Sequence, residues 1–264
     1  MLVIIHPNKD AASVQAAKIV SDQIRRKPDS VLGLSTGNTP LGTYTELIRM
    51  HRDEGLDFSG VTTFNLDEYF GISREHAQSF YSQIHTSFLD HVNLRSDRTH
   101  VPDGESPDFA KTCSDYEAAI RDAGGLDLQI LGIGRTGHIG FNEPTSSLAS
   151  RTRLKTLSDE TINDNSKISG DLPQVAITMG IGTILEAKQI LLLAFGDAKS
   201  NAVARAIEGP ISSSCSASAL QMHGDVRFIL DDHAAAGLRH RSYYDRVVAQ
   251  TKKYAPKLLG ITND

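Results

Sequence analysis

The sequence predicts an α/β protein built on a doubly wound, mainly parallel β-sheet with helices on both faces. Short apolar runs alternate with segments of helical periodicity along the chain, which is the pattern of successive strand–helix units. Several of these runs are apolar at every position, as in residues 190–195 (ILLLAF), and such strands are typically covered by helices on both sides. The sequence contains no internal repeat or long linker, so we expect one domain over residues 1–264.

The elements are expected in regular order. The apolar run at residues 1–6 is the first strand, and Pro7 ends it. Further strands are expected at Val31–Ser35, Val61–Leu66, Leu126–Ile133, Ile190–Phe195 and Val226–Leu230. Helices are expected at Ala12–Arg26, Leu41–Arg52, Ser79–Phe88, Pro107–Ala123 and Ala198–Glu208, with Thr39 as a possible cap of the second. Sheets of this class bind ligands beyond the carboxyl ends of their strands, so the chemistry is expected there.

Composition narrows the function classes. The net charge of -5 provides no positive excess for nucleic acid or an anionic membrane surface. Cys113 and Cys215 are far apart, so we expect two free thiols in a reducing compartment. No histidine pair has metal-ligand spacing beside a carboxylate, and no apolar run approaches the ~20 residues that cross a bilayer. A cytoplasmic protein without a metal site is therefore expected.

The first candidate motif is the segment at residues 35–40 (STGNTP), between an apolar strand and a helix. Gly37 allows close approach to the backbone, and the Thr36 and Thr39 hydroxyls can donate hydrogen bonds. The following helix N-terminus carries partial positive charge, so the motif predicts a phosphate cradle. It has neither Walker nor dinucleotide-binding spacing. The alternative is a structural turn with a helix cap.

The second candidate motif places Asp67 and Glu68 after the next strand. Alternation along an extended backbone sends their side chains in opposite directions. One carboxylate can therefore face a ligand while the other holds the scaffold. A carboxylate with tuned basicity could abstract a carbon-bound proton there. The alternative is a solvated acidic turn.

The third candidate motif is the glycine-rich loop at residues 132–144 (GIGRTGHIGFNEP). Its glycines allow the backbone to turn tightly after a strand and to approach a ligand. His138 titrates near neutrality and can exchange protons with a ligand oxygen, and Glu143 is near enough in sequence to orient the imidazole. The alternative is a packed or solvated histidine.

The fourth candidate is Lys199, which opens a helix after the ILLLAF strand. A lysine at a helix N-terminus can act as a point charge for a phosphate group. The alternative is an ordinary surface lysine.

In this order, the motifs resemble the glucosamine-6-phosphate deaminase family over nearly the whole chain. The similarity is strongest at residues 34–40 (LSTGNTP), 63–71 (TFNLDEYFG), 137–155 (GHIGFNEPTSSLASRTRLK) and 178–187 (TMGIGTILEA). The resemblance implies an enzyme that converts glucosamine 6-phosphate and water to fructose 6-phosphate and ammonium. It implies no metal or organic cofactor, and its expected partner is a small amino-sugar 6-phosphate.

The resemblance also implies a role for each matching residue. Asp67 matches the base that moves a proton from C2 to C1 of the sugar. His138 matches the residue that opens the ring, with Glu143 as its partner, and Thr136 stands where the family usually has Asp or Asn. The residues implied to bind the phosphate are Thr36, Gly37, Asn38, Thr39, Lys199 and Lys167. Lys167 replaces an arginine that the family often has. It lies on a polar segment near 158–172, which is either a mobile lid over the site or an ordinary surface loop.

A regulatory site is implied by four further matches. In allosteric members, these positions bind the phosphate of an N-acetylated activator between subunits, and here they are Ser146, Ser147, Arg153 and Lys155. The alternative is a hydrophilic surface loop. The family contains both monomers and hexamers, so a homo-oligomer is possible.

Three other functions stay open on the sequence. Thr136 and Lys167 leave room for galactosamine 6-phosphate as the preferred substrate. A 6-phosphogluconolactonase shares the architecture, although lactone hydrolysis needs no carbon-bound proton abstraction. A sugar-phosphate sensor without catalysis is the third, although the sequence contains no visible DNA-binding segment.

Overall fold

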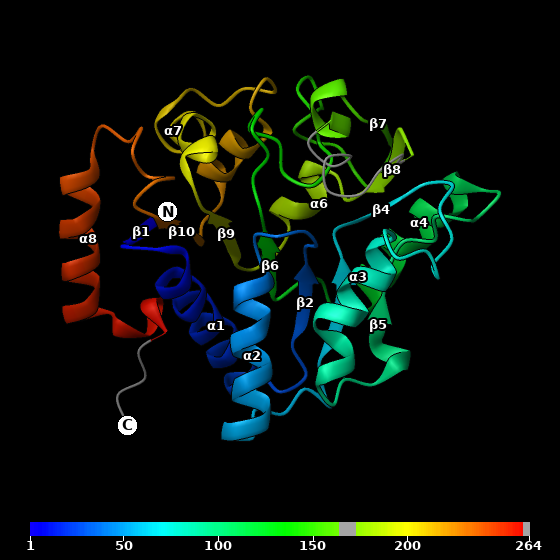
Figure 1. Cartoon of the computed structure of the whole chain (residues 1–264), viewed down its shortest axis with the longest axis horizontal. Helices are drawn as coiled ribbons and strands as arrows, with labels where there is room; N and C mark the ends of the chain where they lie inside the picture. Colours follow the sequence, from blue (N-terminus) through cyan, green and yellow to red (C-terminus); the bar gives the residue numbers. More distant parts are fainter. Residues whose placement is uncertain (164–172, 261–264) are drawn as a thin grey trace.

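The computed structural model describes residues 1–163 and 173–260. Seven strands form a sheet in which every neighbouring pair is parallel (Figure 1). In order across the sheet they are β1 (Leu2–His6), β10 (Val226–Asp231), β9 (Ile190–Ala194), β6 (Leu128–Leu131), β2 (Val31–Leu34), β3 (Thr62–Asn65) and β5 (Thr99–His100). The strands expected from the sequence are all present, although β6 is shorter because its last residues turn into the glycine-rich loop.

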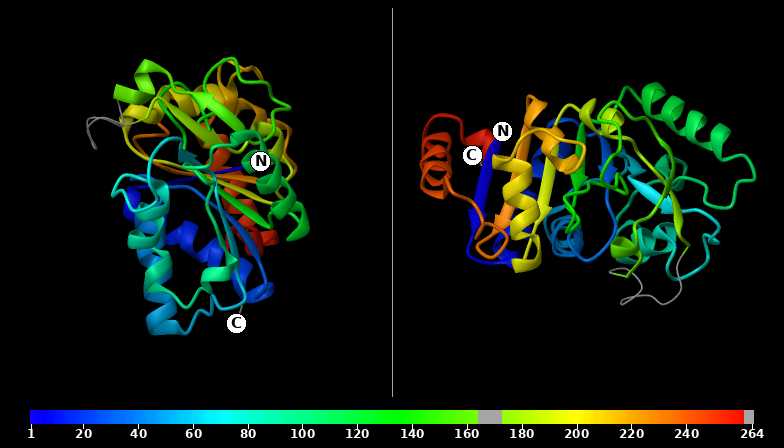
Figure 2. Two further views of the ribbon diagram at one scale, coloured as in Figure 1. Left: turned by 90° about the vertical axis from the view of Figure 1, so that its right-hand side faces the viewer. Right: turned by 90° about the horizontal axis from the view of Figure 1, so that it is seen from above.

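Helices cover the sheet on both faces, and the expected fold class is confirmed. One face packs against α1 (Lys9–Arg26), α2 (Leu41–Glu54) and α3 (Phe80–Ser87). The other packs against α4 (Phe109–Asp122), α6 (Ile181–Leu185), α7 (Ser200–Glu208) and the 3-10 helix η4 (Ser216–Met222). The last helix, α8 (Arg241–Tyr254), lies beside β1 at the sheet edge (Figure 2).

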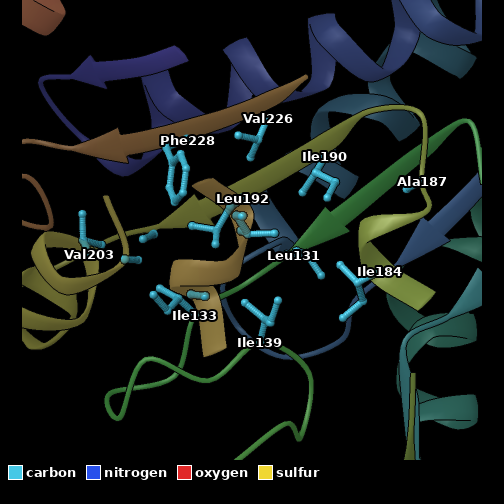
Figure 3. Packing of buried hydrophobic residues seen from close by; sticks show 14 of the residues in the cluster. Leu131, Ile133, Ile139, Ile184, Ala187, Ile190, Leu192, Val203, Val226 and Phe228 are labelled. Atoms are coloured by element: carbon cyan, nitrogen blue, oxygen red, sulfur yellow. The ribbon is translucent and has the colours of Figure 1, made fainter. Parts of the chain in front are cut away.

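Consecutive residues of the central strands pack into two separate hydrophobic clusters. On β9, Leu191 and Leu193 pack with the side chains of α1 and α2, whereas Leu192 packs on the other side. Figure 3 shows Leu192 close to Phe228 of β10, with Val203 of α7 in the same cluster. Burial of each such side chain stabilises the fold by about 1.5–3 kcal/mol. The central strands are therefore held from both faces.

A second, three-stranded antiparallel sheet was not expected from the sequence. It contains β4 (Asp67–Tyr69), β8 (Val175–Thr178) and β7 (Arg153–Thr156), with β8 in the middle. Periodicity cannot reveal a strand as short as β4, and the sequence of β7 (RLKT) is largely polar. Only Leu66 separates β3 from β4, so Asp67, which the sequence analysis placed at the end of one strand, is the first residue of the next.

Helix starts differ from the expected positions for local reasons. The helix α1 starts at Lys9 because the Asn8 side chain accepts the Ala11 N–H at 2.9 Å. A short 3-10 helix, η3 (Asp197–Lys199), precedes α7. The helix α8 has no buried residue, so its sequence has no strong apolar face that would predict it.

We predict that Leu192→Ala lowers the free energy of unfolding by about 2–5 kcal/mol, because it leaves a cavity in the core. Leu192 is 0% exposed, whereas Leu258 of the 3-10 helix η5 (Pro256–Leu259) is 45% exposed. Leu258→Ala is therefore the matched control. Urea denaturation of both variants checks the prediction, and equal losses of unfolding free energy would contradict it.

The expectation of a single domain predicts one cooperative transition in the same experiment.

Candidate active site

A cavity of about 630 Å³ opens at the carboxyl ends of the parallel strands. The sequence-predicted residues that line it are Thr36, Gly37, Asn38, Thr39, Asp67, His138 and Lys199. It is also lined by residues that the sequence analysis did not single out, among them Lys9, Tyr69, Phe80, Gln83 and Asp231. The sheet topology thus brings four motifs that are distant in sequence to one site, as expected for this class of fold.

The loop after β2 forms one wall of this cavity. Gly37 has a φ of +96°, a conformation that glycine adopts without strain. The Tyr44 hydroxyl donates to the Ser35 carbonyl oxygen at 2.7 Å and fixes the start of the loop. The expected cap by Thr39 is wrong: Pro40 is the N-cap of α2, and no side chain caps the helix. The first N–H groups of α2 therefore stay available to an anionic ligand.

Two lysines line the same cavity. Lys199 lies at the end of η3, directly before α7. Lys9 lies in the first turn of α1, and its ammonium donates to the Asn38 carbonyl oxygen at 3.2 Å. Sequence reasoning missed Lys9 because it placed the start of α1 at Ala12. The available signal was Asn8, a residue type that favours the N-cap position.

Asp67 and Glu68 point in different directions, as strand alternation predicts. Asp67 lines the cavity and is only 6% exposed. Glu68 is buried elsewhere and accepts the backbone N–H groups of Tyr69, Phe80 and Tyr81, each at 2.8 Å. Two of these donors are the first residues of α3. Glu68 therefore joins the strand that carries Asp67 to the helix whose Phe80 lines the cavity.

The surroundings of Asp67 favour its protonated form. Burial, and then the negative charge of Glu68, raise the pKa of the Asp67 carboxyl well above its usual value. Glu68 receives three N–H donors, whereas the described part of the chain supplies no such donor to the Asp67 carboxylate. Gly140 lies against it: a Cβ on Gly140 would be 3.4 Å from Asp67 Oδ2 and 2.8 Å from Thr178 Oγ1. The glycine allows the loop to pass close to this carboxyl group.

The His138 imidazole contacts two side chains through one of its nitrogens. Its Nδ1 lies 2.8 Å from Thr136 Oγ1 and 3.4 Å from Glu143 Oε2. Its ring packs over Gly134, where a Cβ would lie 2.1 Å from Nε2. Because Nδ1 is engaged with Thr136 and Glu143, Nε2 is the nitrogen that can exchange a proton with a ligand. Thr136 and Glu143 do not line the main cavity, but Thr136 lines a smaller one of about 110 Å³ beside His138.

Glu143 is a buried carboxylate with a low proton affinity. Burial raises its pKa, but the contact with His138 and the hydrogen bond from the Thr161 hydroxyl outweigh burial and lower the pKa to about 2. The Ser158 N–H also donates to it, at 3.2 Å. Glu143 is therefore negatively charged at neutral pH, 3.4 Å from His138 Nδ1.

Core residues anchor the glycine-rich loop. Ile133 and Ile139 belong to the same hydrophobic cluster as Leu131 and Leu192 (Figure 3), and Ile139 is 0% exposed. The backbone N–H of Gly134 donates to the His138 carbonyl oxygen at 2.9 Å and closes the turn. The backbone at His138 is thus fixed by the buried Ile139 on one side and by the turn from Gly134 on the other.

The four predicted regulatory residues do not share one cavity in the described structure. Ser146 is buried and Ser147 is exposed, and both lie in the loop after Glu143. Arg153 and Lys155 lie on β7. Of the four, Arg153 lines a separate cavity of about 450 Å³, together with side chains of α4. Lys167 and residues 164–172 of the expected lid lie outside the described residues.

Residues 1–163 and 173–260 were surveyed for metal-ligand clusters and membrane-spanning helices. Within these ranges, no cluster of three or more His, Cys, Asp or Glu side chains is arranged to hold a metal ion. No helix in them combines the length and the apolar character that crossing a membrane requires. Cys113 and Cys215 are both buried and free, as expected.

Residues 8–228 match the family model described as glucosamine-6-phosphate isomerases/6-phosphogluconolactonase. The chain is 45% identical over 258 residues to a glucosamine-6-phosphate deaminase from Shewanella loihica, covering 96% of each chain. It is 48% identical over 247 residues to one from Rhodococcus jostii, covering 92% of this chain and 95% of the relative. The chain belongs to the glucosamine-6-phosphate deaminase family.

Solved structures agree with this family membership. A monomeric glucosamine-6-phosphate deaminase superposes with a TM-score of 0.88 at 43% identity, covering 90% of this chain and all of that one (100%). The 6-phosphogluconolactonase from Trypanosoma brucei superposes with a TM-score of 0.73 at 19% identity, covering 90% of this chain and 98% of that one. This second likeness shows that the deaminase family shares its fold with lactonases.

We predict that Asp67→Asn makes the protein more stable at neutral pH. The unfolded-state pKa of Asp67 is near 3.8, and burial raises the folded-state value well above it. Between these two values the folded protein binds the extra proton, so the stability of the parent falls as the pH rises. An asparagine does not ionise, so this dependence on pH is absent in the variant.

Urea denaturation at several values between about pH 4 and pH 7 measures this difference. Asp245→Asn, at an exposed position on α8, is the control and should follow the parent. A stability difference between Asp67→Asn and the parent that is constant across this range would show that Asp67 has an ordinary pKa.

Proposed function

We propose that this protein is a glucosamine-6-phosphate deaminase, which converts glucosamine 6-phosphate and water to fructose 6-phosphate and ammonium. Family membership supports the proposal. The observation that carries it is the buried Asp67 carboxyl in the same cavity as His138 and the anion-binding loop after β2. An isomerisation needs a base that moves a carbon-bound proton, whereas a lactone hydrolysis does not.

The 6-phosphate group binds in the loop formed by Thr36, Gly37, Asn38 and Thr39, with Lys199 as a positive charge. The first N–H groups of α2 and the threonine hydroxyls are donors for its oxygens. Lys9 lines the same cavity and adds a second cation near the loop. Binding the phosphate at a distance from the reacting carbons orients C1 and C2 toward Asp67.

His138 opens the sugar ring by proton exchange with the ring oxygen. The imidazole lines the cavity, and Glu143 keeps a negative charge 3.4 Å from its Nδ1. This charge stabilises the imidazolium form that appears during the exchange. Thr136 holds Nδ1 from another side at 2.8 Å, but a hydroxyl adds no negative charge. The full stabilising charge therefore comes from Glu143.

Asp67 removes the proton from C2 of the open-chain sugar and returns it at C1. The electron pair released at C2 forms the C1–C2 double bond of an enol-type intermediate, while the π pair of the C1 carbonyl group moves to its oxygen, which takes up a proton and becomes a hydroxyl group. When C1 receives the proton, C2 becomes an imine carbon. Water adds to this carbon and the nitrogen leaves as ammonium. Burial raises the pKa of Asp67, and a base with a pKa near the working pH is the more effective proton acceptor.

Product analysis tests the proposal. Purified protein is incubated separately with glucosamine 6-phosphate, galactosamine 6-phosphate and 6-phosphogluconolactone, and ammonium, ketose 6-phosphate and acid are measured. Equal amounts of ammonium and fructose 6-phosphate from the glucosamine substrate are expected. Faster turnover of galactosamine 6-phosphate would show that this epimer is the preferred substrate. Acid from the lactone without ammonium would establish a lactonase, and binding without turnover would establish a sensor.

We predict that Asp67→Asn lowers kcat by at least about 10²–10⁴-fold, because the base is removed while the phosphate contacts stay. Calorimetry should show nearly unchanged binding of glucosamine 6-phosphate. Asp245→Asn is again the control and should keep the parent kcat. Near-normal turnover in Asp67→Asn would disprove the role of this residue.

We further propose that Ser146, Ser147, Arg153 and Lys155 bind the phosphate of an N-acetylated activator. The expected outcome is that N-acetylglucosamine 6-phosphate lowers the half-saturating substrate concentration of the parent, and that Lys155→Ala loses this response. The measurement is a saturation curve with and without the activator. A hyperbolic curve that does not respond to it would reject the regulatory site.

A further inference from the structure

The Arg153 guanidinium reaches from β7 to the loop that carries His138. Its Nη1 donates to Asn142 Oδ1 at 2.8 Å and lies 3.4 Å from the Arg151 carbonyl oxygen. Within residues 1–163 and 173–260, these neutral oxygens are its hydrogen-bond acceptors, and no carboxylate lies within ion-pair distance of it. Arg153 is only partly exposed. A half-buried charge with neutral partners costs desolvation energy, so its position calls for an explanation.

Asn142 transmits this contact to the loop. It is 0% exposed, and its side-chain nitrogen donates to the carbonyl oxygens of Ile139 and Met179 at 2.9 and 2.8 Å. Two carbonyl acceptors on one side and the Arg153 donor on the other fix the orientation of its amide. Asn142 directly precedes Glu143. Loss of these contacts would release the backbone at Asn142, which leads directly into Glu143, the carboxylate that contacts His138.

Neutral side chains hold the segment 139–142, whereas Arg205 of α7 donates to the Thr136 carbonyl oxygen at 3.2 Å, earlier in the loop. The Ser216 hydroxyl accepts the Ile139 N–H at 3.2 Å and donates to the Asn142 carbonyl oxygen at 2.9 Å. The Phe141 N–H donates to Thr178 Oγ1 at 3.1 Å. Arg153 adds a charged donor, and hydrogen bonds from charged donors are the shorter and stronger ones. It also joins the loop to β7, whereas Ser216 belongs to η4 and Thr178 to β8.

We propose that Arg153 has a second role besides the activator contact proposed above: without a bound activator it is a positioning residue for the reaction, and through Asn142 it sets the place of Glu143 relative to His138. The inference rests on the proposed function for its kinetic consequence, but the contact itself does not depend on it. Arg153 does not line the 630 Å³ cavity, so it acts without touching the substrate. It lines the separate 450 Å³ cavity with Arg121 and Arg151.

Arg153→Ala is expected to lower kcat by about 10- to 100-fold, because small misplacements of catalytic groups have effects of this size. KM should change little, since the phosphate-binding loop and Lys199 make no contact with Arg153. Free guanidinium at non-denaturing concentration and the variant Arg153→Lys should each restore part of kcat, because both return a cationic donor to Asn142. Arg121→Ala removes an exposed arginine from the same cavity and should keep the parent kcat.

Hydrogen–deuterium exchange provides a readout that does not need turnover. Amide exchange in the segment 138–143 should be faster in Arg153→Ala than in Arg121→Ala and the parent, while the β9 strand stays equally protected. A parent without deaminase activity would reject the proposed function, and the exchange data would still decide on the contact. Three results would overturn the positioning role. The first is unchanged exchange in this segment, and the second is a parent-like kcat in Arg153→Ala. The third is a loss of kcat that neither guanidinium nor the lysine variant restores.

Discussion

Strand β9, near the middle of the large sheet, is apolar on both faces, and this constraint governs where chemistry can occur along it. Leu191 and Leu192 of β9 pack into opposite clusters, so neither face of the strand has room for an unpaired polar group. No polar side chain lies within β9, and Asp197 and Lys199 follow its carboxyl end, although Gln129 of β6 is buried inside a neighbouring strand. Because the strands are parallel, their carboxyl ends meet at one edge, and the cavity with Asp67, His138 and Lys199 lies there.

The site uses three buried carboxylates in three electrostatic environments. Glu68 receives three backbone N–H groups and serves as a structural anchor for α3. Glu143 gains the His138 contact and hydroxyl donors, and its pKa falls to about 2. Asp67 is also buried but receives no such hydrogen bonds from the described residues, and its pKa is raised. The same side-chain chemistry thus gives an anchor, a fixed charge and a carboxyl group with a raised pKa, which is the proposed proton acceptor, according to the hydrogen-bond donors around it.

The large sheet was predictable because runs such as residues 190–195 are apolar at each position, and the main motifs were predictable because they follow those strands. The small sheet was not predictable, since β4 has three residues and β7 is largely polar. Phe80 and Lys9 could not be placed in the cavity from sequence either. Their positions depend on the Glu68 contact with α3 and on the true start of α1, which are tertiary and capping effects.

Asp67 pairs with Thr178 in the small sheet, whereas the loop after β2 and Lys199 extend from the large one. The proposed proton acceptor and the proposed phosphate loop therefore stand on separate sheets, which are linked along the chain by Leu66 and across space by the Phe141–Thr178 and Arg153–Asn142 hydrogen bonds. Loosening of the small sheet alone would leave molecules that still capture sugar phosphate but cannot process it. Under mild heat or denaturant, the enzyme would then bind its substrate without converting it, before the whole chain unfolds.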